Sequence, residues 1–344
     1  MIFEQIATGG CQSYLVGCAD SCSAVLIDPE ISQVDRYIAL AARDGLRIHY
    51  VIDTHTHADH FSATRAIAQA LKVPVVMHRD SPAPFADLRL QDADLLRVGN
   101  LRVQALHTPG HTADSMCLLL DDRIFTGDTL LIGGTGRTDL PSGDPSALYD
   151  SLFNGILKLD PALRVYPAHD YKQRGFTTIA QELASNPRLQ HSDRLDFIQM
   201  MEQLDLNAPT HLTEALRTNM SGGKSVAQLL AEAASKTPFV SLSELRARTL
   251  AGSADLVVLD VRERDAFDAA HIPGAVNLPR GQLELRVNDV LPDPTRRIVT
   301  LCQFGKVSTL AAATLRELGF LRTSALDGGM TAWQEAGYPL EQTG

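Results

Sequence analysis

Residues 53–60 have the sequence DTHTHADH, which places three imidazoles and two carboxylates within one short stretch. The stretch follows the apolar run Tyr50–Ile52 and precedes a helical segment that we expect to begin near Ser62. Histidine and aspartate are frequent ligands of first-row transition metals, so a cluster of this density predicts a metal site. Isolated histidines are more often solvated or hydrogen-bonded side chains, and we expect this of His49, His78, His191 and His211.

Further candidate ligands lie just after other strand-like runs. They are His111 in TPGHT (108–112), Asp128 in TGDT (126–129) and His169 in YPAHDY (166–171). Ligands at the ends of several strands can converge on one edge of a sheet sandwich. By themselves, these residues permit one metal ion or two.

The order of the predicted elements indicates an α/β protein with two domains. Up to about residue 185, apolar runs such as Val73–Val76 alternate with helical stretches such as Ser62–Leu71. Asp121 and Asp122 separate two apolar runs and predict a hairpin, so antiparallel strands accompany the parallel ones. A second αβ alternation begins at Pro238. We therefore expect a first domain at 1–222, a connector at 223–237 and a second domain at 238–344.

The motifs HxHxDH, PGHT, GD and PAHD, in this order and spacing, resemble the metallo-β-lactamase superfamily over roughly residues 1–222. The resemblance implies an αββα sandwich with the metal site at its edge. The superfamily contains hydrolases, oxidoreductases and nucleases, so the fold alone does not fix the reaction.

Four segments resemble persulfide dioxygenases more closely, namely 127–132, 136–139, 166–171 and 186–189. In that family one Fe(II) is held by two histidines and one aspartate, which correspond to His55, His111 and Asp128. This is the facial triad of a non-haem iron oxygenase. The remaining residues of the motif are implied to lie outside the direct ligands, where they can hydrogen-bond to ligands, water or product: His57, Asp59, His60 and His169.

The resemblance implies oxidation of glutathione persulfide by O₂ and water to sulfite and glutathione. An anionic substrate in an acidic protein needs a local cation, for which the resemblance suggests Arg137, while Tyr171 could supply a hydroxyl group. Lys172 and Arg174 could add to the local positive charge. A surface ion pair is the alternative role of Arg137.

The rival prediction is thioester hydrolysis of the glyoxalase II type. In that case the histidines, Asp59 and a bridging Asp128 would hold two metal ions that generate hydroxide. Metal content and dependence on O₂ would separate the two functions.

Cys302 follows the strand-like run Arg297–Leu301 and precedes a loop and a helical run from Ser308. A strand, a cysteine, a Gly-containing loop and a helix N-terminus form a site that favours the thiolate. The thiolate can attack a sulfane sulfur and pass it to an acceptor thiol. A buried apolar cysteine is the alternative, and we expect it for Cys11, Cys18, Cys22 and Cys117.

Four segments around Cys302 resemble a rhodanese domain over about residues 238–341: DVRE (260–263), HIPGAVN (271–277), LDGGM (326–330) and Trp333. The resemblance implies a central parallel sheet and sulfur transfer between thiosulfate and glutathione, with Gln303, Gly305 and Lys306 binding substrate. Rhodanese loops often carry arginine where this chain has Val307, so the preference for thiosulfate is in question. A non-catalytic carrier or docking module is the alternative for this domain.

Composition limits the partners. The 344 residues carry a formal charge of −10, which argues against a nucleic-acid partner. No apolar stretch predicts a membrane span or a signal peptide, so we expect a cytoplasmic protein that does not bind membranes. The five cysteines are odd in number and sparse, which argues against a disulfide framework. The expected partners are small-molecule substrates, and the family resemblance makes a homodimer plausible.

Overall fold

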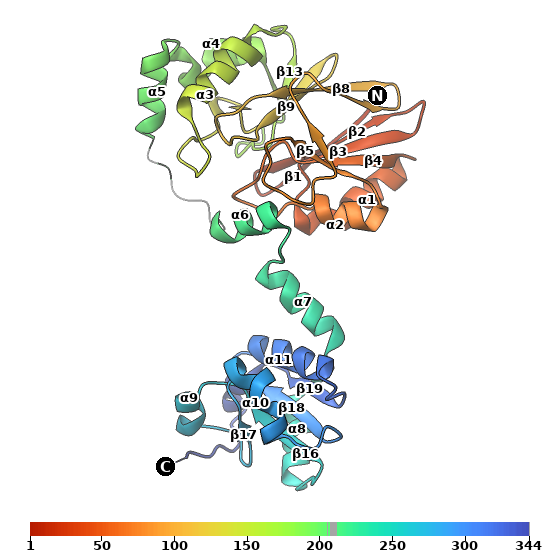
Figure 1. The fold of residues 1–344 in the computed structure, drawn as a ribbon, viewed down its shortest axis with the longest axis vertical. Helices are drawn as coiled ribbons and strands as arrows, with labels where there is room; N and C mark the ends of the chain where they lie inside the picture. The colour runs from red at the N-terminus through yellow and green to blue at the C-terminus, as the bar shows by residue number, and fades with distance from the viewer. Residues whose placement is uncertain (205, 207–211, 344) are drawn as a thin grey trace. The chain divides into compact units, whose positions relative to one another are not determined.

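The computed structural model describes residues 1–204, 206 and 212–343, so His211 lies outside the described residues. The chain forms two compact units, Met1–Gly223 and Lys224–Gly344 (Figure 1). Within the described residues, no helix combines the length and apolar character needed to span a membrane.

The first unit contains two six-stranded sheets. One has the order β1-β2-β3-β4-β5-β6, with bounds Ile2–Thr8, Cys11–Cys18, Ser23–Ile27, Arg47–Ile52, Val75–His78 and Leu88–Leu90. The other has the order β14-β13-β10-β9-β8-β7, with bounds Thr177–Thr178, Arg164–Pro167, Arg123–Gly127, Met116–Leu119, Leu101–His107 and Leu95–Val98. A small hairpin is formed by β11 (Leu130–Leu131) and β12 (Gly134–Thr135).

Helices cover the outer faces of the two sheets (Figure 1). The first sheet packs against α1 (Val34–Arg43) and α2 (Thr64–Leu71), whereas α3 (Pro145–Tyr149), α4 (Ile179–Ser185) and α5 (Arg194–Glu202) cover the second. The last helix of the unit is α6 (Leu212–Ser221). Strand periodicity explains the layers, because alternate side chains enter opposite cores. Tyr14 and Val16 of β2 join the core between the sheets, while Leu15 joins the core under the helices.

This architecture is the predicted αββα sandwich with mixed sheets. The Asp121–Asp122 turn joins β9 to β10, which pair in antiparallel fashion, so the predicted hairpin is present. The helix expected near Ser62 begins at Thr64 instead. Ser62 Oγ hydrogen-bonds to Asp53 at 2.7 Å, outside the helix.

The second unit has a parallel sheet of order β15-β19-β18-β16-β17, as predicted. The strand bounds in chain order are Phe239–Val240, Leu256–Asp260, Val276–Asn277, Arg297–Leu301 and Thr323–Leu326 for β15 to β19. The helix bounds are Val226–Lys236, Leu242–Leu250, Arg264–Ala269, Leu283–Val290, Lys306–Glu317 and Gly329–Glu335 for α7 to α12. Separate apolar cores lie on the two faces of the sheet.

Two features of the second unit differ in detail from the sequence analysis. The predicted connector contains α7, which packs against α11. The helix expected from Ser308 begins at Lys306, because Gly305 adopts φ +84° and lets the chain turn into the helix directly after the Cys302 loop.

Candidate metal centre and reactive cysteine

Three loops bring His55, His111 and Asp128 together at one edge of the sandwich. His55 follows β4, His111 lies between β8 and β9, and Asp128 directly follows β10. One possible ligand atom from each residue lies within 4.8 Å of the others. Asp128 Oδ2 is 3.5 Å from His111 Nε2 and 4.0 Å from His55 Nε2. All three side chains are buried.

Hydrogen bonds fix which ring nitrogen of each histidine is available. Thr54 Oγ1 donates to Asp28 Oδ2 at 2.9 Å and therefore accepts from His55 Nδ1 at 3.0 Å. The carbonyl of Arg137 accepts from His111 Nδ1 at 2.8 Å. Both rings thus direct the lone pair of Nε2 toward Asp128, as in metal sites whose outer hydrogen bonds orient the ligands.

The residues fit a bound cation. His55 Nε2 is buried and has no hydrogen-bond partner among the described residues. An unpaired buried nitrogen is costly unless something satisfies it. Burial and the neighbouring His57 lower the pKa of His55 to about 3, so its ring is neutral, as a ligand must be. Two imidazoles and one carboxylate form a donor set suited to Fe(II).

His57 lies next to His55, with ring centroids 4.2 Å apart, but its Nε2 faces a separate pair of carboxylates. Its Nε2 lies 3.2 Å from Asp28 Oδ1 and 3.7 Å from Asp53 Oδ1, and all three side chains are buried. Possible ligand atoms of His57, Asp28 and Asp53 form a separate group. The HxH pair of the sequence motif is therefore divided between two environments.

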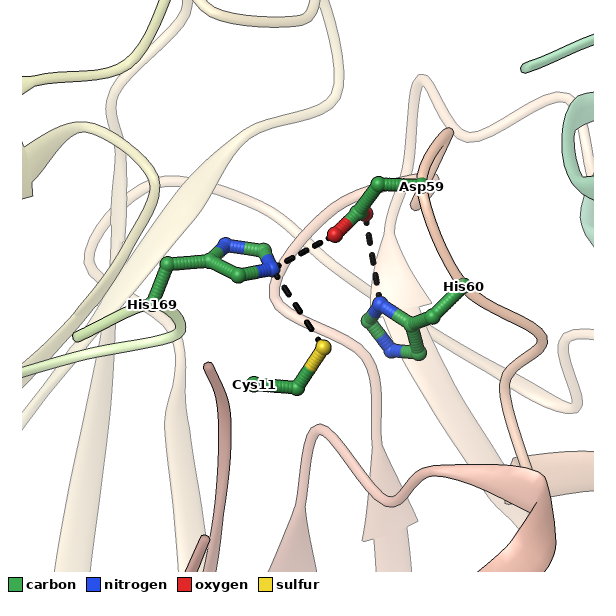
Figure 2. Close-up of side chains that lie close together, drawn as sticks. All are labelled: Cys11, Asp59, His60 and His169. Carbon is green, nitrogen blue, oxygen red and sulfur yellow. Dashed lines mark hydrogen bonds and ion pairs between the residues drawn. The ribbon is translucent and has the colours of Figure 1, made fainter. Parts of the chain in front are cut away.

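Asp59, His60 and His169 form a second cluster, which Cys11 joins (Figure 2). Asp59 bridges the two rings, with Oδ2 at 2.6 Å from His169 Nε2 and Oδ1 at 3.2 Å from His60 Nδ1. Cys11 Sγ lies 3.6 Å from His169 Nε2. The cluster is linked to the first group because His169 Nδ1 lies 2.7 Å from Asp128 Oδ1. Cys11 was predicted from the sequence to be a buried apolar residue, and it lies here instead.

The second cluster is held together by opposite charges. Burial opposes the charged forms, but hydrogen bonds to His169 and His60 lower the pKa of Asp59. Burial likewise opposes the charge on His60, yet the neighbouring Asp59 and Cys11 raise its pKa to about 10. Against the same burial penalty, Asp128 and Asp59 raise the pKa of His169 well above its usual value. Two imidazolium groups thus lie beside carboxylates.

Asn219 of α6 secures the loop that carries the clustered histidines. Its buried amide donates to the carbonyls of His57 and His60, both at 2.8 Å, and accepts from Ser62 N at 3.1 Å. The sequence analysis missed this residue, because no local signal connects an asparagine in a helix to a loop so far away in the chain.

A cavity of about 610 Å³ opens over both clusters. Its wall includes Cys11, His111, Asp128 and His169. Tyr171, which is 73% exposed, also lines it and stacks on His169 with ring centroids 5.6 Å apart.

Four cationic side chains line the cavity: Arg137, Lys172, Arg174 and Arg188. Arg137 forms a bidentate ion pair with Asp139, with both N–O distances 2.6 Å. Arg188 is half-buried and donates to the carbonyl of Thr135 at 2.6 Å. Among the described residues, no carboxylate pairs with Arg188 or Lys172, and the sequence analysis did not single out Arg188 as a site residue.

In the second unit, Cys302 lies directly between β18 and the turn into α11. Its Sγ accepts a hydrogen bond from Ser308 N at 3.2 Å, so a backbone amide near the helix N-terminus faces the sulfur. Gln303 donates to Thr331 Oγ1 at 3.0 Å. Its side chain is thus engaged within the fold.

A cavity of about 440 Å³ adjoins this loop. It is lined by Gly305, Lys306 and the exposed Phe304, with part of α7. Lys306 has no ion-pair partner among the described residues, and the neighbouring Val307 is 43% exposed. The wall of this cavity therefore combines one cation and the carboxylate of Asp327 with apolar side chains, and Cys302 itself does not line it.

Comparison with known proteins identifies both units. Residues 6–169 match the model of the metallo-beta-lactamase superfamily, and residues 241–336 match the model of the rhodanese-like domain. The mitochondrial persulfide dioxygenase ETHE1 of Mus musculus is 37% identical over 214 residues, which are 61% of this chain and 84% of that protein. The crystal structure of ETHE1 from Myxococcus xanthus is 42% identical with a TM-score of 0.63, and the match covers 65% of this chain and 100% of that chain.

A hydrolase is also among the relatives. The hydroxyacylglutathione hydrolase of Anaeromyxobacter dehalogenans is 37% identical over 172 residues, which are 50% of this chain and 66% of that protein. The match to the persulfide dioxygenase extends over more of both chains.

The hydroxyl group of Thr54 should be needed for tight metal binding. Thr54→Val keeps the shape but removes the link between Asp28 and His55 Nδ1, so we expect metal affinity to fall about 10- to 100-fold. Competition with a chelator measures this. The matched control is Thr56→Val, because Thr56 Oγ1 donates to the buried Asp114 at 2.6 Å and does not contact the three proposed ligands. An equal loss in both variants would contradict the proposed orienting role.

Proposed function

We propose that this chain, which belongs to the persulfide dioxygenase family and carries a rhodanese domain, oxidises glutathione persulfide in its first unit and transfers sulfane sulfur in its second. In the first reaction, GSSH, O₂ and water give GSH, sulfite and two protons. In the second, sulfur passes between thiosulfate and glutathione through Cys302.

The arrangement of His55, His111 and Asp128 carries the first part of the proposal. One metal ion bound by two imidazoles and a carboxylate would keep several positions open for ligands other than protein. Possible ligand atoms of these three residues group together without His57, which supports a set of three ligands. A bound Fe(II) would supply the activation of O₂ and of the terminal sulfur of the persulfide.

The other residues of the cavity would bind and orient the substrate. Glutathione carries two carboxylates, and Arg188 and Lys172 offer positive charge on the wall of a protein whose formal charge is −10. Tyr171 adds a hydroxyl group at the rim, whereas Asp139 offsets the charge of Arg137. The imidazolium groups of His60 and His169 would stabilise negative charge that develops on sulfite oxygens.

Dinuclear thioester hydrolysis is the second candidate. It is favoured by one observation, the close grouping of Asp59, His60 and His169 beside Asp128, and by the similarity to a hydroxyacylglutathione hydrolase. A second metal ion would have to replace the ion pairs that now join Asp59 to both rings. Cys11 would lie beside it.

Cys302 would work as a nucleophile in the second unit. Its thiolate attacks the outer sulfur of thiosulfate, the new S–S bond forms, and sulfite leaves with the electrons of the old bond. A glutathione thiolate then attacks the outer sulfur of the cysteine persulfide and restores the Cys302 thiolate. The Ser308 amide stabilises negative charge on sulfur, and Lys306 attracts the anionic substrates.

Oxygen uptake and metal content, measured on the same sample, test the first activity. We expect iron-reconstituted protein with about one iron per chain to consume O₂ and form sulfite when glutathione persulfide is added. His111→Ala should abolish both, because it removes a ligand. No O₂ uptake, with two metals per chain and hydrolysis of a glutathione thioester, would instead establish the hydrolase.

Arg188 should contribute to substrate binding. Arg188→Met keeps an apolar stem but removes the charge, so we expect the KM for glutathione persulfide to rise about tenfold or more with little change in kcat. The control is Arg36→Met, since Arg36 is exposed and lies outside the cavity. If KM is the same in both variants and in the parent, Arg188 does not anchor the substrate.

Cys302→Ser should abolish sulfur transfer from thiosulfate but leave the oxidation of added glutathione persulfide intact, because the two sites lie in different units. Val307→Arg should lower the KM for thiosulfate, since a guanidinium can bind an oxyanion through two hydrogen bonds. The rate of thiocyanate formation from thiosulfate and cyanide measures sulfur transfer in both variants. An unchanged rate in Cys302→Ser would support the docking-module alternative.

A further inference from the structure

Cys11 is fixed at the wall of the first cavity. It begins β2 directly after Gly10, which adopts φ +114° and where a Cβ atom would lie 2.7 Å from the Tyr171 ring. Backbone hydrogen bonds flank it, from Gln12 N to the carbonyl of Ala168 at 2.7 Å and from Asp170 N to the carbonyl of Gly10 at 2.9 Å. These bonds hold Cys11 beside the segment after β13 that carries His169.

The surroundings of this thiol differ from those of the other cysteines in the first unit. Its sulfur faces His169 Nε2 at 3.6 Å, and Asp59 joins that ring to His60 (Figure 2). His60 is only 8% exposed, and its Nε2 has no hydrogen-bond partner among the described residues. Cys11 and Asp59 both line the cavity that also contains His111 and Asp128.

Two other cysteines provide the contrast. Cys22 is exposed, and its sulfur contacts the carbonyl of Ala19 at 3.7 Å. Cys117 is fully buried and hydrogen-bonds to Thr108. Neither combines an imidazole partner with access to the cavity.

We propose that Cys11 is a sulfane-sulfur acceptor in the first site, which receives the outer sulfur of a persulfide and holds it as a cysteine persulfide beside the metal centre. This inference rests on the proposed function for its substrate class. It adds a covalent protein-bound state that the direct oxidation of glutathione persulfide does not require.

The transfer step balances without another reactant. The Cys11 thiolate attacks the outer sulfur of GSSH, the bond from Sγ to that sulfur forms, and the S–S bond of GSSH breaks. Glutathione leaves as a thiolate and takes up the proton that the Cys11 thiol released, while the transferred sulfur remains as Cys11–S–SH. No electrons are gained or lost overall, because one persulfide replaces another.

The cluster favours this chemistry for two physical reasons. Nucleophilic cysteines in proteins are often paired with a histidine ring, and here Cys11 Sγ lies 3.6 Å from His169 Nε2, which Asp59 orients. The attacking sulfur also lies on the wall of a cavity large enough for a peptide-sized thiol.

The test is mass spectrometry of the full chain carrying Cys302→Ser, freed of iron with a chelator and treated with glutathione persulfide. Without iron, a persulfide on Cys11 is not consumed by oxidation. We expect the Cys11 peptide to gain one sulfur atom at least about tenfold faster than the Cys22 peptide, and the Cys117 peptide to remain unmodified. This result can be read whether or not the enzyme consumes O₂, so it is independent of the oxygen-uptake experiment.

Two variants complete the test. Cys11→Ser should lose the modification, and His60→Gln should slow it several-fold while thermal unfolding confirms an intact fold. Modification of Cys11 no faster than that of Cys22 would overturn the proposal. The proposal would also be overturned if Cys11 reacted only after a chelator had removed a second metal ion, because the cluster would then be a metal site.

Discussion

A buried carboxylate, Asp28, is the group on which the arrangement of the metal loop depends. It accepts hydrogen bonds from Thr54 N at 2.7 Å, from Thr54 Oγ1 at 2.9 Å and from His57 Nε2 at 3.2 Å. A buried charge must be satisfied in this way, which makes the geometry rigid. Through Thr54 it fixes the His55 ring, and by its own contact with Nε2 it orients the His57 ring. The orientation of two histidine rings therefore depends on a residue outside the ligand motifs.

The sequence was sufficient to predict the sandwich, the parallel sheet of the second unit and the gathering of ligands at one edge. These predictions succeed because they depend on local regularities. Alternation along β2 assigns Tyr14 and Leu15 to different cores, and each ligand follows the end of a strand, where neighbouring loops meet. Cys302 likewise lies between a strand and a helix, as its neighbours predict.

What the sequence could not predict depends on contacts between distant residues. Asn219 reaches carbonyls of the loop at 57–60, and Arg188 reaches the cavity from a segment after α4. Cys11 was expected to be apolar and buried, and only the pairing of its loop with the end of β13 brings it to His169. The start of α11 at Lys306 required knowledge of the backbone at Gly305. Neither composition nor periodicity carries such information.

Asn219 also has a mechanical consequence. It lies in α6, the last helix before the first unit ends at Gly223, and outside the stretch that matches the superfamily model. A pull on the polypeptide where it leaves this unit would act on α6 and, through two hydrogen bonds, on the carbonyls of His57 and His60. A load on the chain at this exit would therefore reach the histidine loop, and a fragment cut at residue 169 would lose that restraint.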